Sequence, residues 1–128
     1  MPFISIKINA QESKELREKT ANIILNNTNS ILNKKRDVTS VLVEFVPENS
    51  WFIGNENVLT FYLEIKITKG TNTKDQKARY IKTMYDDLKK LLGEISPASY
   101  VILDEVEADT WGFEGLTQEF RYIESKMS

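Results

Sequence analysis

The stretch Met1-Pro2-Phe3-Ile4-Ser5-Ile6-Lys7-Ile8 has the pattern of a short β-strand. Apolar residues at 4, 6 and 8 alternate with Ser5 and Lys7, and a period of two indicates a strand with one buried face. Pro2 stands at the first strand position, where a missing N–H is tolerated. The motif Ile6-Lys7-Ile8 recurs 59 residues further along as Ile65-Lys66-Ile67. The opening strand therefore also indicates an internal repeat.

The second half of the chain repeats the order of elements of the first. Val41, Val46 and Trp51 recur 60 residues later as Val101, Val106 and Trp111. Hydrophobic spacing predicts one helix between Glu12 and Lys34 and a second between a Thr73–Gln76 capping box and Gly93. Each half thus has the order strand, helix, strand, and a short segment at 116–123 follows. The further strands are predicted at 40–46, 59–67 and 99–106.

This order predicts an α/β (α+β) fold with a four-stranded mixed sheet and both helices on one of its faces. The chain is expected to form a single domain, 1–128, with repeat halves of about 2–57 and 58–128. The uncovered sheet face would carry apolar residues among charged ones. Such a face favours self-association into a ring. Its apolar residues are Leu42, Tyr62, Ile102 and Val106, between Lys7, Glu44, Glu64, Lys66 and Asp104.

The amino-acid composition excludes several classes of catalytic and binding site. The 128 residues include no cysteine and no histidine, which excludes disulfides, thiolate catalysis and Ser-His-Asp chemistry. It also disfavours a transition-metal site, and no acidic loop has the spacing of a calcium site, so neither metal nor cofactor is expected. The net charge of −2 gives no reason to expect nucleic acid. Without a membrane-spanning run or a secretory leader, a cytoplasmic protein is expected.

Several motifs together resemble the tautomerase superfamily. They are Pro2 at the start of a strand, the doubled strand–helix–strand unit, the turns after the last strand of each half, and Ile95-Ser96-Pro97 before the fourth strand. The resemblance is to 4-oxalocrotonate tautomerase, malonate semialdehyde decarboxylase and macrophage migration inhibitory factor, and it covers nearly the whole chain. The two turns are Val46-Pro47-Glu48-Asn49-Ser50-Trp51-Phe52-Ile53-Gly54 and Trp111-Gly112-Phe113-Glu114-Gly115-Leu116-Thr117.

The resemblance implies a homotrimeric barrel in which Pro2 is the catalytic residue. Removal of Met1 would leave a secondary amine, and desolvation with a nearby cation would keep that amine neutral. A neutral amine can take a proton from the carbon next to a carbonyl and return it elsewhere. The expected activity is that of an isomerase acting on a small 2-oxo acid or aryl pyruvate. The expected partners are this carbonyl or carboxylate substrate and two further copies of the chain.

The supporting site residues follow from the same resemblance. The family usually has an arginine directly after the glycine that follows the third strand, but here Gly70 is followed by Thr71. Lys69 is the candidate replacement, although lysine lacks the planar fork of arginine. The other candidates for substrate binding are Arg36, Asp37, Trp51 and Trp111. Each also has a structural alternative: a solvated lysine, a helix-terminal cation, a turn residue, or a tryptophan at a subunit contact.

Three alternatives remain beside the isomerase. The missing arginine favours a trimeric protein that has kept the fold with weak or no catalysis. A decarboxylase or hydratase of the same superfamily would use a protonated proline as an acid. A ferredoxin-like regulatory module would need a different strand order and would leave the repeated tryptophan unexplained.

Overall fold

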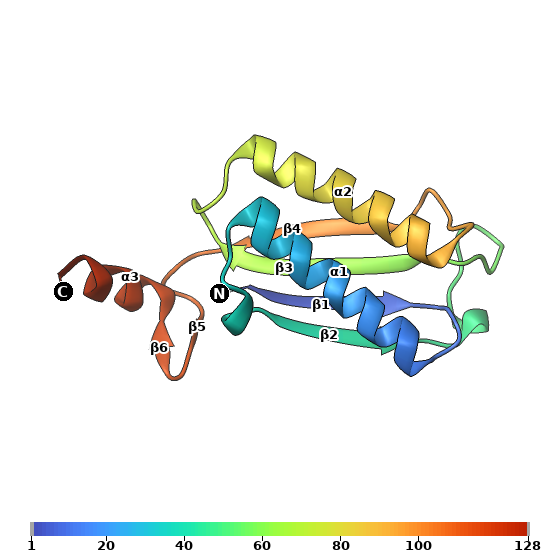
Figure 1. Cartoon of the computed structure of the whole chain (residues 1–128), viewed down its shortest axis with the longest axis horizontal. Coiled ribbons are helices and arrows are strands. Elements are labelled where there is room, and N and C mark those ends of the chain that lie inside the picture. Colours follow the sequence, from blue (N-terminus) through green and yellow to red (C-terminus); the bar gives the residue numbers. More distant parts are fainter. Residues whose placement is uncertain (1, 128) are drawn as a thin grey trace.

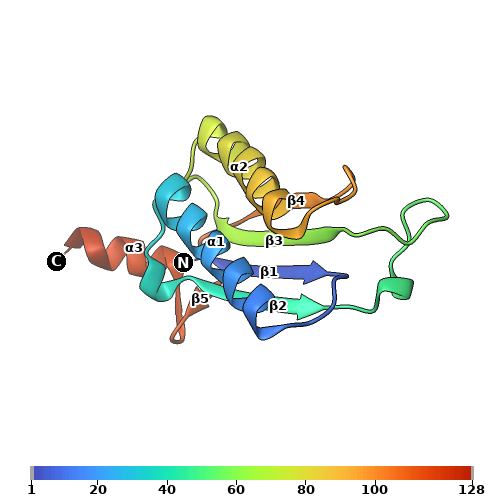
Figure 2. The same ribbon diagram turned by 45° about the vertical axis from the view of Figure 1, so that its right-hand side comes forward.

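The computed structural model describes residues 2–127 and consists of a sheet layer and a helix layer (Figure 1). Helices α1 and α2 lie on the same face of a four-stranded sheet, and a short hairpin with helix α3 extends beyond one end of it (Figures 1 and 2). The elements in chain order are β1 (Phe3–Ile8), α1 (Lys14–Leu32), η1 (Arg36–Val38), β2 (Ser40–Phe45), η2 (Glu48–Ser50), β3 (Phe61–Thr68), α2 (Lys74–Leu92), β4 (Tyr100–Val106), β5 (Gly112–Phe113), β6 (Leu116–Thr117) and α3 (Gln118–Met127).

The main sheet has the strand order β2-β1-β3-β4. Strands β1 and β2 are parallel, β3 and β4 are parallel, and the two central strands β1 and β3 are antiparallel. Each parallel pair is joined through one helix, as a crossover connection requires. The predicted mixed sheet with two helices on one face is therefore confirmed.

The two halves share the same strand register. In the first half Ile4 pairs with Val41, and in the second half Leu63 pairs with Val101. Leu63 lies 59 positions after Ile4, and Val101 lies 60 after Val41, which matches the spacing of the sequence repeat. The antiparallel pairing of β1 with β3 sets the two halves side by side in opposite directions.

The core lies between the sheet and the helices. Ile4, Ile6 and Ile8 of β1 are fully buried, and so is every second residue of β3 from Phe61 to Ile67. The helices contribute side chains at three- and four-residue spacing, which places them on one face. The buried helix residues are Thr20, Ile24, Asn27, Thr28, Ile31, Leu32, Tyr80, Met84 and Leu88.

The ends of the long helices are fixed by local chemistry. The Ser13 side chain accepts a hydrogen bond from the Leu16 N–H at the start of α1, and Asn33 ends that helix in the left-handed conformation, with φ 57°. Helix α2 begins with the predicted capping box, in which Thr73 and Gln76 exchange side-chain and backbone hydrogen bonds.

The sheet face opposite the helices is only partly covered. Leu42 is 47% exposed and Tyr100 is 58% exposed, and both belong to the edge strands. Between them Lys66 lies 2.6 Å from an Asp104 oxygen. The predicted mixture of apolar and charged side chains on this face is thus present.

Two segments differ from the sequence prediction. Strand β3 begins at Phe61 and not at Leu59, because the backbone before it bonds to other partners: Val58 and Thr60 to the Asn9 side chain, and the Leu59 carbonyl to the Ser96 N–H. The segment predicted at 116–123 is a strand followed by a helix that continues to Met127. Its helix begins where Thr117 Oγ1 accepts a hydrogen bond from the Phe120 N–H.

Candidate functional site

One end of the sheet gathers most of the predicted site residues. Strands β1 and β2 begin at this end, and the antiparallel β3 and its parallel partner β4 finish there. The C-terminal end of α1 and the N-terminal end of α2 lie at the same end (Figure 1). Pro2, Arg36, Asp37, Lys69 and Trp111 are therefore brought to one edge of the molecule.

Pro2 is buried at the start of β1. Its carbonyl oxygen accepts a hydrogen bond of 3.2 Å from the Ser40 N–H, which ties it to the start of β2. Because the ladder pairs Phe3 with Lys66, Pro2 lies beside the end of β3, where the Lys69–Thr71 loop begins. Met1, whose removal would free the proline nitrogen, lies outside the described residues.

A cavity of about 600 Å³ opens at this end of the sheet. Its walls come from the end of α1, the loop after β3, the start of the C-terminal segment and helix α3. Three cations, Lys34, Lys69 and Arg121, and one carboxylate, Glu119, line it. The wall therefore favours an anionic ligand.

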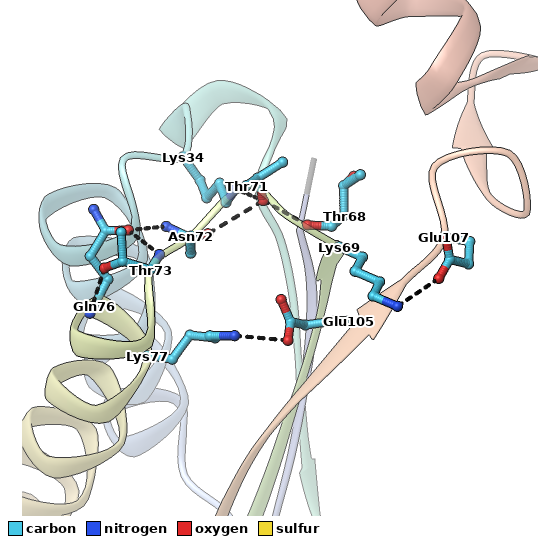
Figure 3. A network of polar contacts seen from close by, with 10 residues as sticks. All are labelled: Lys34, Thr68, Lys69, Thr71, Asn72, Thr73, Gln76, Lys77, Glu105 and Glu107. Carbon is cyan, nitrogen blue, oxygen red and sulfur yellow. Dashed lines mark hydrogen bonds and ion pairs between the residues drawn. The ribbon is translucent and has the colours of Figure 1, made fainter.

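Lys34, and not the predicted Arg36, is the cation that the end of the first helix brings to the cavity wall. Its Nζ donates a hydrogen bond of 2.8 Å to Thr71 Oγ1, and the Thr71 hydroxyl donates one of 2.7 Å to the Thr68 carbonyl (Figure 3). Lys34 is half-buried, and this burial lowers its pKa because the charged form is poorly solvated. Helix α1 thus supplies a cation to the residue that stands after Gly70.

The loop after β3 is held in place by the neighbouring strand and helix. Gly70 has a φ of 84°, in the region that favours glycine, and the preceding Lys69 N–H donates a hydrogen bond of 2.9 Å to the Val106 carbonyl of β4. Lys77 Nζ lies 2.8 Å from the Glu105 carboxylate (Figure 3). The bond from Lys77 lowers the pKa of Glu105. The loop therefore lies between β4 and α2, which the contact between Lys77 and Glu105 joins.

The predicted polar residues are not turned toward the cavity equally. Lys69 lines it, but its Nζ lies 3.1 Å from a Glu107 oxygen, and both side chains are exposed (Figure 3). The Arg36 guanidinium reaches back along α1 to the side-chain oxygen of Asn26. Asp37 lies in η1 and is exposed. Of these three, only Lys69 is in the cavity wall.

The two tryptophans lie at opposite ends of the sheet. Trp111 follows β4 and is at the cavity end, where its carbonyl oxygen accepts a hydrogen bond of 3.0 Å from the Gln118 N–H. Trp51 follows β2 and therefore lies at the other end, about 20 Å away along a six-residue strand. Within one chain, Trp51 and Pro2 therefore lie at opposite ends of the sheet.

Lys34, Thr71 and Arg121 line the cavity but were not among the site residues predicted from the sequence. Asn33, a residue that tolerates the left-handed conformation, was the signal that α1 ends one residue before Lys34. Apolar residues at 120, 123 and 127 have helical spacing and were the signal for α3, which carries Arg121.

The described residues lack both a group of metal-binding side chains and a membrane-spanning helix. Across residues 2–127, no three His, Cys, Asp or Glu side chains are grouped to hold a metal ion. In the same range, no helix is both long enough and apolar enough to span a membrane.

Comparisons with known proteins agree with this architecture. A family model described as "Tautomerase enzyme" matches residues 62–121. Probable tautomerase K2 of Dickeya dadantii (strain 3937) is 39% identical over 54 residues, which are 42% of this chain and 81% of that protein.

Solved structures share the fold over most of their length. A fused 4-OT wild-type asymmetric trimer has a TM-score of 0.85 at 14% identity, covering 94% of this chain and 98% of the other. Pt0534 inactivated by 2-oxo-3-pentynoate gives 0.85 at 12% identity, covering 93% and 98%. A macrophage migration inhibitory factor-like protein from Entamoeba histolytica gives 0.77 at 17% identity, covering 91% and 97%.

Proposed function

Since this chain belongs to the tautomerase family, we propose that it is an isomerase that interconverts the keto and enol forms of a small 2-oxo acid or aryl pyruvate. The observation that carries the proposal is that buried Pro2 lies at the same end of the sheet as a cation-lined cavity of about 600 Å³, next to the strand end that leads into the cavity wall; Pro2 itself does not line the cavity. A volume of this size suits a small ligand.

In this proposal Pro2 is the general base once Met1 has been removed. Burial disfavours an ammonium ion, and a cation of the neighbouring cavity wall would act in the same direction, so the secondary amine would be neutral near pH 7. It would take a proton from the carbon next to the substrate carbonyl and return a proton at the other end of the enol. No second base is required, because one amine can serve in both steps.

In this proposal the cavity cations stabilise the negative charge that develops during the reaction. Removing a proton next to a carbonyl builds negative charge on the carbonyl oxygen, and a fixed cation lowers the energy of that charge. We propose Lys34, which lines the cavity and is held on Thr71 Oγ1 at 2.8 Å, for this role. We propose Lys69 as a weaker contributor, since Glu107 lies 3.1 Å from its Nζ.

We propose that three copies of the chain assemble through the uncovered sheet face. Leu42, Tyr100 and Ile102 are 47%, 58% and 36% exposed there, and no element of the described chain covers them. The fused 4-OT structures that share this fold are trimers. For Trp51, at the far end of the sheet, we propose packing at a subunit contact.

A second candidate is a trimeric protein of the same fold with weak or no catalysis. Thr71, in place of an arginine after Gly70, is the observation that favours it. A decarboxylase or hydratase is a variant of the first proposal in which Pro2 stays protonated and Asp37, at the same end of the sheet, assists.

Kinetics of a Pro2→Ala variant distinguish the two candidates. With phenylpyruvate followed by ultraviolet absorbance, the isomerase proposal predicts a loss of about 10²- to 10⁴-fold in kcat/KM, the contribution typical of a general base. Pro47→Ala, at the other end of the sheet, is the matched control and should retain full activity. A Pro2→Ala enzyme as fast as the wild type would reject the isomerase proposal.

A further inference from the structure

We propose that Arg121, carried by helix α3, binds the substrate carboxylate. This inference rests on the proposed function, because it concerns the ligand of the same cavity. It assigns the carboxylate to the C-terminal segment of the chain and not to the loop after β3, whose Thr71 has no charge.

Arg121 is held in position without being neutralised. Its guanidinium carbon lies 3.7 Å from the centre of the Phe113 ring, and Nη2 donates a hydrogen bond of 3.0 Å to the Phe113 carbonyl. Stacking and this single bond fix the plane of the guanidinium. Glu114 Oε2 is 3.7 Å away, and that carboxylate is 82% exposed, so the ion pair is weak.

Two buried donors at this wall of the cavity, one of them in the guanidinium itself, lack hydrogen-bond acceptors. The Arg121 Nε and the Gln118 Nε2 are buried, and neither has a hydrogen-bond partner. Both residues line the cavity and stand three positions apart, which places them on one side of α3. A buried donor without an acceptor is unfavourable, because it has lost its hydrogen bonds to water without replacing them. An oxygen-rich anion at this wall would supply the missing acceptors.

A small adjustment of α3 is enough to make these contacts. Gln118 and Arg121 are only partly buried and the other described residues of α3 are exposed, so the helix can shift against the sheet with little loss of packing. A carboxylate in the cavity would meet the terminal nitrogens of the guanidinium first. A tilt of the helix would then bring Nε and the Gln118 amide onto the same anion.

The other cations at this end are less suited to the task. Lys69 is already paired with Glu107, and Arg36 binds amide oxygens on α1. Lys34 faces the cavity as a point charge and donates to a neutral hydroxyl. Among residues 2–127, Arg121 is the one arginine in the cavity wall, and a planar fork matches a carboxylate in two places at once.

The test compares an acid with its ester in an Arg121→Gln variant. Glutamine keeps a polar N–H donor of similar shape at this position, and it removes the charge. With phenylpyruvate we expect KM to rise about 10- to 100-fold, as loss of a charge-assisted bond predicts. With methyl phenylpyruvate, which has no carboxylate, we expect the kcat/KM of the variant to equal that of the wild type. Arg121→Lys should recover part of the affinity for the acid.

Binding of phenylacetate, which does not react, separates this inference from the proposed catalysis. By NMR titration, Arg121→Gln should weaken phenylacetate binding about tenfold or more even if Pro2→Ala shows that the chain is no isomerase. Arg79→Gln, an exposed arginine on α2, should bind phenylacetate like the wild type. Equal losses on acid and ester, undiminished phenylacetate binding by Arg121→Gln, or no phenylacetate binding by the wild type would each overturn the inference.

Discussion

Lys34 Nζ and Thr71 Oγ1 lie 2.8 Å apart and join the end of helix α1 to the loop after β3. Thr71, the residue after Gly70, carries no charge, so the cation at this point of the cavity comes from the end of helix α1. Because Lys34 is half-buried, its charge is held there at a cost in solvation.

Replacing this lysine should separate stability from activity. Lys34→Met removes a poorly solvated charge and keeps the aliphatic stem, so we expect an unchanged or higher free energy of unfolding and a roughly tenfold loss of kcat/KM for phenylpyruvate. Lys35→Met, on the exposed neighbour, should change neither. A large loss of stability in Lys34→Met would contradict the proposed role.

The same lysine gives a pH dependence at the alkaline end. Its folded pKa is lowered from 10.5, so between the two values the unfolded chain binds more protons and the free energy of unfolding rises with pH. Lys34→Met should lack this contribution. Denaturant titrations of both proteins between pH 8 and about pH 10.5 would measure the difference.

Glu105 should stabilise the loop above its own pKa. Its folded pKa is lowered from 4.5, so its contribution is complete above about pH 4.5 and is lost as the pH falls through the folded value. Glu105→Gln should cost about 0.5–1 kcal/mol of unfolding free energy at pH 7 and almost nothing near pH 2. Glu94→Gln, on an exposed residue, is the control. An equal loss at both pH values would contradict the electrostatic explanation.

The buried hydroxyl pair between the helices predicts an asymmetry. Thr28 Oγ1 donates to the Ile24 carbonyl and lies 2.9 Å from the Tyr80 hydroxyl, which must then be the donor to Thr28. Thr28→Val leaves the tyrosine hydroxyl buried without a partner, at about 1–3 kcal/mol, whereas Tyr80→Phe leaves Thr28 bonded and should cost about 1 kcal/mol. Urea unfolding of both variants would measure this order, and the reverse order would contradict it.

The proposed trimer depends on the uncovered sheet face. Ile102→Lys places a charge on that face, and a threefold assembly would repeat it three times, so we expect monomers by light scattering with an intact fold by circular dichroism. Ile81→Lys, on an exposed position of α2, should leave the assembly unchanged. A trimer that tolerates Ile102→Lys would place the interface elsewhere.

The sheet was predictable because its residues alternate strictly. The buried positions of β1 and β3 fall at every second residue, and the capping box of α2 is visible in the sequence. Which basic residue near the end of α1 lines the cavity was harder to predict from the sequence. Helix α1 ends at Asn33, so Lys34 faces the loop, and Arg36, two residues later, turns back to Asn26. An uncertainty of two residues in a helix end was enough to change the cation.

The C-terminal segment was the least predictable part. Its helix contains no buried residue, so no strong pattern of core positions marks it. Arg121 meets the cavity only because the hairpin of β5 and β6 turns the chain back at Gly112–Thr117. Such a contact depends on a short turn and on tertiary packing, so the local sequence pattern does not predict it.

The most direct test of the central claim is covalent labelling followed by intact-mass and peptide analysis. 2-Oxo-3-pentynoate, which inactivated a protein of the same fold, needs a free nucleophile to form an adduct. We predict a chain without Met1, one adduct per chain on the Pro2 nitrogen, and loss of activity in proportion to labelling. A retained Met1, an adduct on another residue, or full labelling with undiminished activity would contradict the role of Pro2.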